Sequence, residues 1–363
     1  MKSSLSLSSF RLLNFKAIQD SKAIKFTPLT AFIGNNGSGK SSIIEALETF
    51  QALTLHGVDS AMQPWHGFEY IWNRSTRHKT VAANPMTFKF RGLINDKKFK
   101  ARLKISASEN LNKVFFHEYD YSIGSSKFTD GSDYIANGEI KEPNLKAFVE
   151  NWQFLKLVPH IMTEPIFQKR TYGKILLDRT GFNIAEYLQS VRDIDIQAFN
   201  GIVETVKAIL PYTIDIQPSI TSELERKVYL NLSEKNISIN LPGWLLSSGT
   251  LRLICLLTLL RHPEPPSVVV IEEIENGLDP RTVHLLIEEL RYFVESGKGQ
   301  IIITTHSPYL LDLLSLDHII VTERDNSGSP RFIRPSEKEL QDWAKKFSPG
   351  RLYTMGKLMR SFK

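Results

Sequence analysis

The chain has 363 residues, of which 42% are hydrophobic and 23% charged, so it can bury a sizeable core and does not belong to the disordered class. Its one cysteine, Cys255, excludes an internal disulfide, and no apolar stretch approaches the roughly 20 residues that cross a bilayer. Because the N-terminus is also too polar for a signal peptide, we expect a cytoplasmic protein without membrane contact.

The formal net charge of +6 is concentrated in two stretches. Residues 331–363 carry nine Lys or Arg side chains against three acidic ones, which equals the net charge of the whole chain. The second basic cluster, residues 74–104, includes Arg77, Lys79, Lys89, Arg91, Lys97, Lys98, Lys100 and Arg102. Such clusters can hold a phosphate backbone, which makes DNA a candidate partner, although a solvated basic face is the more common reason for them.

Residues 5–33 alternate apolar and polar positions, which predicts two strands that lead into residues 34–41, GNNGSGKS. This spacing is that of a P-loop. Gly37 and Gly39 lack the Cβ atoms that would keep the backbone N–H groups away from phosphate oxygens. Lys40 can reach the β- and γ-phosphates of a nucleotide, and the hydroxyl of Ser41 can bind Mg²⁺. A glycine-rich turn that binds no phosphate is the alternative.

The next elements follow from hydrophobic periodicity. A helix of about three turns is expected from Ser41, and no regular pattern is visible over residues 54–80. Residues 86–94, 98–106 and 114–123 predict an antiparallel sheet, followed by a surface loop over residues 124–142. Further patterns predict a helix at residues 142–152, two helices within residues 183–210 and a short meander over residues 213–240.

A strand buried on both faces is predicted at residues 268–271, and it ends in two carboxylates. Ligands bind at the carboxyl ends of such strands, so we expect Glu272 to hold Mg²⁺ and Glu273 to orient or deprotonate the attacking water. Two solvated, inert acids are the alternative. A second buried strand, residues 301–303, leads to His306, which we expect beside the γ-phosphate and not in a purely structural role.

Residues 247–249 (SSG) precede a strongly apolar helix, where hydroxyls and helix-end N–H groups can form a second anion site. Ordinary capping of a buried helix by serine is the alternative. Residues 276–280 (NGLDP) form a turn, and Arg281 begins a helix that Gly297 ends.

The ordered motifs GNNGSGKS, LSSGT (residues 246–250), VVVIEE, NGLDP and TTHS resemble the ATP-binding-cassette ATPases of the branch that contains RecF, the SMC proteins and the OLD (overcoming lysogenization defect) ATPases. The lead-in FRLLNFKA (residues 10–17) is similar to that branch as well, and the resemblance covers nearly the whole chain. It implies an α/β fold of the P-loop NTPase type, with a mixed central sheet, an antiparallel β-subdomain and a helical signature lobe.

In such ATPases two subunits sandwich two ATP molecules, each held by the P-loop of one subunit and the signature motif of the other. The resemblance therefore implies that Ser247 and Gly249 contact the γ-phosphate in trans, that Asp279 crosses the dimer, and that Glu273 is the catalytic base. His306 becomes the γ-phosphate sensor, and Asn36 assists near the attacking water. The nucleotide-binding residues expected in the P-loop are Gly34, Asn35, Asn36, Gly37, Ser38, Gly39, Lys40, Ser41 and Ser42.

Several positions depart from the family pattern. Glu272 stands where most members have Asp, and Ser248 and Thr250 replace the usual Gly and Gln of the signature. The glutamine that contacts the metal in this family has two candidates here, Gln153 and Gln168.

We expect one ATPase domain over residues 1–363, with a P-loop and β lobe (1–135), a helical signature lobe (136–262), the acidic and histidine motifs (263–325) and a basic tail (326–363). Only 57 residues follow His306, so we expect a stand-alone ATPase without the TOPRIM nuclease of OLD proteins. By resemblance, such ATPases control a separate nuclease or toxin in bacterial anti-phage defence. The alternatives are a RecF-like DNA clamp for repair or recombination and, less in keeping with the motifs, the nucleotide-binding subunit of a transporter.

Overall fold

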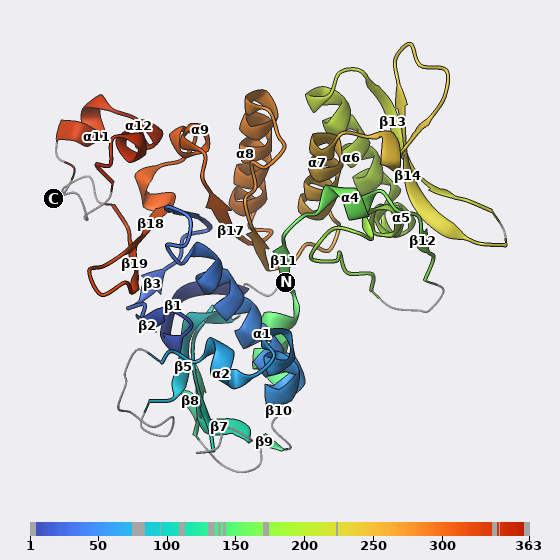
Figure 1. The fold of residues 1–363 in the computed structure, drawn as a ribbon. Coiled ribbons are helices and arrows are strands. Elements are labelled where there is room, and N and C mark those ends of the chain that lie inside the picture. The colour runs from blue at the N-terminus through green and yellow to red at the C-terminus, as the bar shows by residue number, and fades with distance from the viewer. Residues whose placement is uncertain are drawn as a thin grey trace. The chain divides into compact units, whose positions relative to one another are not determined.

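The computed structural model describes residues 5–74, 84–94, 96–108, 113–129, 135–136, 139–140, 143–169, 174–222, 224–335, 340 and 342–358. The chain forms two compact units, which we call unit 1 (Met1–Trp152 and Gly299–Lys363) and unit 2 (Gln153–Lys298). Figure 1 shows the fold coloured along the sequence. The predicted four-part division of the chain remains a prediction.

Unit 1 contains an antiparallel sheet in the order β2-β1-β5-β6-β7-β8, with β3 also paired to β1. Its strands are β1 (Leu5–Phe15), β2 (Ile18–Asp20), β3 (Ile24–Lys25), β5 (Met86–Ile94), β6 (Lys97–Ala107), β7 (Val114–Ile123) and β8 (Ser126–Thr129). The predicted antiparallel sheet is confirmed, and β5 and β7 have the predicted bounds. Part of the second basic cluster, including Arg77 and Lys79, lies outside the described residues.

The predicted surface loop over residues 124–142 is wrong in part. It contains β8, together with a two-stranded ladder of β9 (Ile135–Ala136) and β10 (Glu139–Ile140). These strands are only two to four residues long, too short for an alternating pattern to rise above a Gly- and Ser-rich composition.

One face of the antiparallel sheet is buried against α1. Phe90 stacks on Phe10 with ring centroids 4.4 Å apart and on Phe50 of α1 at 3.7 Å. Because side chains alternate along a strand, Lys89 and Arg91 project from the opposite face of the same strand. The sheet therefore has an aromatic core face and a basic outer face.

Helix α1 (Lys40–Met62) begins one residue earlier than predicted and is longer than the expected three turns. Gly57, at φ 80° and ψ −176°, interrupts its helical geometry near the end. The stretch without a clear period then continues as η1 (Gln63–Trp65) and α2 (Phe68–Ile71), while the helix predicted at residues 142–152 is α3 (Pro143–Glu150).

A second group of strands in unit 1 surrounds β4 (Leu29–Ile33). β4 lies parallel between β17 (Gln300–Thr305) and β18 (Ile319–Arg324), and β19 (Pro330–Ile333) continues antiparallel to β18. All residues of β4 and β17 are buried, as the predicted strand at residues 301–303 required. The short helices that follow these strands are α9 (Pro308–Asp312), η3 (Leu316–His318), α11 (Asp342–Lys346) and α12 (Pro349–Thr354).

Unit 2 is built from four long helices and a small antiparallel sheet. The helices are α5 (Ile184–Ile194), α6 (Ile196–Ile209), α7 (Ser248–Leu260) and α8 (Pro280–Glu295). The sheet has the order β12-β14-β13, with β15 paired to β14: β12 (Ile166–Phe167), β13 (Thr213–Ile220), β14 (Lys227–Glu234) and β15 (Leu241–Pro242). The two helices predicted within residues 183–210 are thereby confirmed.

The predicted meander over residues 213–240 is confirmed for β13 and β14 and is wrong for residues 235–240, which form no strand. Ile237 and Ile239 lie in this irregular segment with 42% and 60% of their surface exposed. The predicted strand at residues 268–271 is β16 (Val268–Ile271), all of it buried, and β11 (Trp152–Leu155), α4 (Pro159–Met162) and η2 (Gly243–Leu245) complete the unit. Within the described residues no helix has the length and apolar character needed to cross a membrane.

Candidate nucleotide-binding site

The turn between β4 and α1 has the backbone of a phosphate-binding loop. Gly37 and Gly39 adopt φ values of 73° and 115°, a left-handed region that side chains with a Cβ disfavour. Gly34 packs so closely on β18 that a Cβ at this position would lie 2.1 Å from the carbonyl oxygen of Thr322. The glycine spacing is therefore dictated by chain geometry at three separate points.

The polar groups of this turn fit an anion. Helix α1 starts without a side-chain cap, so its first N–H groups are not satisfied by a side chain and can point at phosphate oxygens. Ser38 Oγ is buried and has no hydrogen-bond partner among the described residues. Lys40 is 7% exposed, and its ammonium donates to the carbonyl oxygens of Gly34 at 2.7 Å and Asn35 at 3.1 Å.

The remaining P-loop residues lie on the surface of unit 1. Asn35, Asn36 and Ser41 are exposed, and Ser42 is half-buried. A contact that the sequence does not indicate holds this loop, because Arg324 at the end of β18 donates from Nε to the carbonyl oxygen of Gly37 at 2.7 Å. Gly37 and Arg324 are separated by 287 positions, so no local pattern could reveal this pair.

His306 is brought to the P-loop by strand register. In the parallel pairing of β17 with β4, Thr305 is aligned with Ile33, so the next residues in each strand direction are His306 and Gly34. His306 is half-buried, and Thr305 Oγ1 fixes the turn that follows by accepting from Ser307 N at 3.0 Å. The prediction that His306 follows a buried strand is confirmed, and its role toward a γ-phosphate stays a prediction.

In unit 2, Glu272 lies at the end of β16 and is almost fully buried. Its backbone N–H donates to Leu155 O of β11 at 2.9 Å, and its side chain is 6% exposed. The carboxylate accepts a hydrogen bond from Arg179 at 3.0 Å and lies 3.7 Å from the ammonium of Lys156. The sequence analysis did not indicate Arg179 or Lys156 as part of the site, because no local pattern connects them with Glu272.

Glu273 differs from its neighbour in backbone and exposure. Its φ of 50° is in the left-handed region, which costs a non-glycine residue about 1–3 kcal/mol and is concentrated at functional sites. The side chain is exposed and accepts a hydrogen bond from Asn276 Nδ2. Half-buried Arg252 of α7 has its pKa lowered by burial, and the Glu273 charge opposes this shift, so the two groups interact electrostatically.

The signature stretch forms the exposed start of α7. Ser247 and Ser248 are exposed, and Ser247 Oγ caps the helix by accepting from Thr250 N at 3.1 Å. A Cβ on Gly249 would lie 2.5 Å from the carbonyl oxygen of Gly277, so only glycine allows this helix to meet the NGLDP turn. Serine capping is thus present, and Ser247 and Ser248 are nevertheless exposed.

Asp279 is the N-cap of α8. Its carboxylate accepts from the N–H groups of Arg281 at 3.0 Å and Thr282 at 3.1 Å, and from the Thr282 hydroxyl at 2.6 Å. The Thr282 hydroxyl and these N–H groups hold the pKa of Asp279 below its usual range. Asp279 therefore has a structural role as a cap, and its role across a dimer stays a prediction.

The expected metal ligands Ser41 and Glu272 supply one hydroxyl and one carboxylate oxygen, in units 1 and 2 respectively. Mg²⁺ prefers oxygen ligands and is usually held by one or two protein groups together with substrate phosphates, so each of these side chains suits Mg²⁺ chemically within its own unit. The described residues contain no cluster of three or more His, Cys, Asp or Glu side chains, so phosphates would have to complete the coordination.

Both candidates for the metal-contacting glutamine already serve the fold of unit 2. Gln153 Nε2 donates to Leu177 O at 2.8 Å, and Gln168 Oε1 accepts from Arg226 at 2.9 Å. Neither geometry selects one over the other, so the alternatives stay open.

Two protein-family models match the chain. An "AAA ATPase domain" model matches residues 6–151, and a model described as "AAA domain, putative AbiEii toxin, Type IV TA system" matches residues 194–312. These stretches contain the P-loop, the signature motif, both strand-end glutamates and His306. The protein is therefore an ATPase that binds and hydrolyses ATP through a P-loop site.

Two curated proteins are similar to the chain at low sequence identity. The chain is 26% identical, over 51% of its length and 78% of the relative's, to a putative ABC transporter ATP-binding protein of Caldanaerobacter subterraneus subsp. tengcongensis. It is 22% identical, over 88% of its length and 89% of the relative's, to an ATP/GTP phosphatase of Helicobacter pylori.

Solved structures share the fold at low sequence identity. An SMC head bound to the C-terminal winged-helix domain of ScpA has a TM-score of 0.60 at 13% identity, over 92% of this chain and 99% of the other. The SMC head with an extended coiled coil bound to the C-terminal domain of ScpA, from Pyrococcus furiosus, has a TM-score of 0.56 at 12% identity, over 94% and 98%. These neighbours show that the chain has the α/β fold of SMC heads.

Proposed function

We propose that two copies of this chain enclose two ATP molecules between them, and that this ATP-dependent dimer controls a separate nuclease or toxin effector in bacterial anti-phage defence. The observation that carries the dimer is the outward position of Ser247 and Ser248 at the start of α7. If the start of α7 were packed inside its own unit, it could not reach the triphosphate bound by a second copy. The contact of Gly249 with Gly277 fixes the shape of this helix start.

The residues of the P-loop would bind and orient the triphosphate. The N–H groups at the start of α1 surround the phosphates, and the Lys40 ammonium exchanges its contacts with Gly34 O and Asn35 O for phosphate oxygens. Ser41 and Glu272 would hold Mg²⁺, which supplies neutralising charge to the phosphates when bound. Arg179 and Lys156 orient the Glu272 carboxylate in its buried position.

Glu273 and His306 would act at the reacting end of the nucleotide. The strained backbone of Glu273 directs an exposed carboxylate outward, where it can accept a proton from the attacking water, and Asn276 orients that carboxylate. His306, level with the P-loop at the end of β17, would donate to the γ-phosphate. Ser247 and the Gly249 N–H of the second copy would complete the phosphate contacts.

The regulatory role in defence is supported by resemblance. The motifs are similar to those of OLD-type ATPases. The description of the family model that matches residues 194–312 names a putative toxin of a toxin–antitoxin system. An ATPase that dimerises on binding ATP and separates after hydrolysis alternates between two states. Such a cycle is suited to turning a partner protein on or off.

A DNA clamp like that of RecF and SMC proteins is the second candidate. It is favoured by the fold shared with SMC heads and by the basic outer face of the antiparallel sheet. A clamp should bind duplex DNA only when ATP is present, with an affinity that falls steeply with salt, whereas a regulator of a protein effector need not.

The experiment that tests the dimer uses Glu273→Gln, which keeps the shape of the side chain and removes the base. With ATP and Mg²⁺ the variant should trap the sandwich, and light scattering should show a doubled mass that is absent with ADP. A variant that stays monomeric with ATP contradicts the proposal. Affinity capture of the trapped dimer with the product of a neighbouring reading frame then separates the effector role from the clamp.

A further inference from the structure

The outer face of the antiparallel sheet in unit 1 contains a cavity of about 580 Å³. It lies over β1, β5, β6 and β7, and its volume is within the range of small-ligand pockets. Among the described residues, five cationic side chains line it against one carboxylate, Asp120: Arg11, Lys89, Arg91, Lys100 and Arg102. The cavity belongs entirely to one unit and does not include the P-loop.

Strand register arranges these cations in two rows across the sheet. In one row Arg91 is directly opposite Lys100, with Ser9 and Ser122 at the two ends. In the next row Lys89 stands between Arg11 and Arg102. Side chains directly opposite one another have Cβ atoms about 5 Å apart, and like charges there are destabilising.

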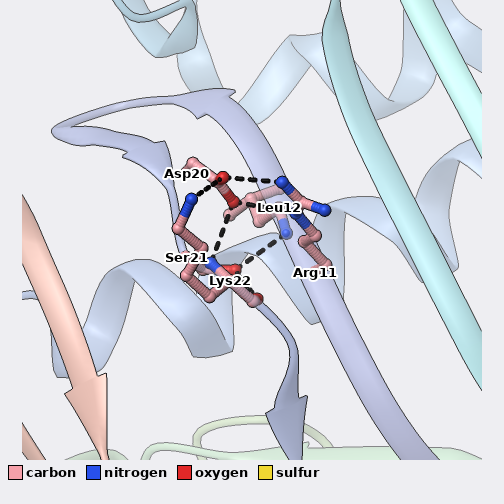
Figure 2. Close-up of polar contacts among 5 residues, drawn as sticks. All are labelled: Arg11, Leu12, Asp20, Ser21 and Lys22. Carbon is pink, nitrogen blue, oxygen red and sulfur yellow. Dashed lines mark hydrogen bonds and ion pairs between the residues drawn. The ribbon is translucent and has the colours of Figure 1, made fainter.

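The two arginines of the second row are neutralised by carboxylates. Arg11 forms a two-pronged ion pair with Asp20, at 2.9 Å from Nε and 2.7 Å from the terminal nitrogen, and Lys22 also binds Asp20 (Figure 2). Burial alone would raise the pKa of Asp20, but these bonds from Arg11 and Lys22 hold it well below the usual range. Arg102 is paired with both Glu118 and Asp120 of β7.

Lys89, Arg91 and Lys100 form no ion pair with any residue that the structure describes. Lys89 is half-buried, and its pKa is lowered by that burial and by the charges of Arg11, Arg102 and Lys104. Arg91 and Lys100 are exposed beside it. Three cations that have no ion-pair partner among the described residues therefore line one cavity at strand spacing. Their mutual repulsion costs folding energy, which an anionic ligand would offset.

We propose that this cavity is a second phosphate-binding site, in which Lys89, Arg91 and Lys100 bind the phosphate groups of a ligand other than the P-loop nucleotide. The fork of Arg91 suits two oxygens of one phosphate, and the two lysines act as point charges on its neighbours. The phosphates can come from a nucleic-acid backbone or from a small polyphosphate. This site is independent of the ATP sandwich.

The test compares two variants of the full-length protein with equal loss of charge. Arg91→Gln/Lys100→Gln removes two exposed cations of the cavity, and Lys346→Gln/Arg351→Gln removes two exposed cations of the C-terminal basic stretch. Neither pair belongs to the ATP site, so the ATPase rate should equal that of the unmodified protein. The cavity variant should also unfold at the same or a higher urea concentration, because it loses like-charge repulsion.

Two probes distinguish the source of the phosphates: a fluorescein-labelled DNA duplex followed by anisotropy, and inorganic tripolyphosphate titrated calorimetrically with Mg-ADP in excess. The cavity variant should lose most of the binding of one probe, and for DNA the slope of log Kd against log salt should fall by about two. The control should keep both. Unchanged binding in the cavity variant, an equal loss in the control, or no binding of either probe by the unmodified protein overturns the proposal.

Discussion

The guanidinium of Arg179 lies 3.0 Å from the carboxylate of Glu272, the residue that follows the buried strand β16. Ninety-three positions separate the two residues, and Lys156 approaches the same carboxylate at 3.7 Å. The acid expected to hold Mg²⁺ is therefore also the buried centre of a small ion-pair network. A buried carboxylate is costly without partners, and Arg179 and Lys156 supply them here.

Arg179→Gln should destabilise unit 2, because it leaves a buried carboxylate with only the more distant Lys156. We expect a loss of about 1–2 kcal/mol in the free energy of unfolding by urea, the range for a buried acceptor that loses its partner. Lys174→Gln, which removes an exposed pair with Glu264 at 3.7 Å, is the control and should change stability by less than about 0.5 kcal/mol. Equal effects of the two variants would show that the network does not stabilise Glu272.

Lys40→Ala should abolish hydrolysis. The ammonium is the one side-chain charge that the P-loop itself offers to the phosphates, and loss of such a group typically costs a factor of about 10² to 10³ in rate. Phosphate release from ATP measures it, with Lys346→Ala as a surface control. ATPase activity that survives in Lys40→Ala means that the P-loop is misassigned.

Ser247→Arg should stop hydrolysis and leave ATP binding to the isolated subunit intact. Because Ser247 also caps α7, this change removes a cap worth about 1 kcal/mol. Ser247→Asp separates the two effects, since aspartate is an equally good cap but repels a γ-phosphate. Hydrolysis should fail in both variants, and Ser222→Arg on an exposed turn of the same unit should be silent. If Ser247→Asp still hydrolyses ATP, Ser247 acts only as the cap of α7 and does not contact a γ-phosphate.

Acid should weaken unit 1 partly through Asp20. Its pKa is lower in the folded protein than the usual value of about 4, so the stabilisation is complete above that value and is lost as the pH falls below it. Asp20→Asn should therefore cost stability at pH 7 and reduce the further loss between about pH 5 and pH 3. Urea unfolding at both pH values measures this, with Asp59→Asn at an exposed position of α1 as the control. A loss below pH 4 that is as steep in Asp20→Asn as in the unmodified protein contradicts this role.

Local patterns predicted most of the elements. The P-loop, β7 and β16 were predicted because spacing, alternation and β-branched runs act over a few neighbouring residues. The interruption of helical geometry at Gly57 was not predicted, because the hydrophobic period of a helix can continue through a glycine. The strands β8 to β10 were not predicted, because two to four residues are too few to show an alternating pattern.

The parts of the site that the sequence could not provide are long-range contacts. Arg324 holds Gly37, Arg179 holds Glu272, and Gly249 packs on Gly277, and each pair is set by tertiary packing and not by periodicity. The same holds for the cavity on the outer sheet face. Composition showed a basic cluster there, but only strand register shows which of its cations are paired with carboxylates and which are not.

The central claim is that each ATP site is built from two copies of the chain, and complementation between two inactive variants tests it most directly. Lys40→Ala retains an intact Ser247, and Ser247→Asp retains an intact P-loop. When the two purified variants are mixed, some dimers contain one complete site, so ATP hydrolysis should reappear although each variant alone has none. A mixture that stays as inactive as its separate components, at concentrations where the unmodified protein is active, would contradict the account.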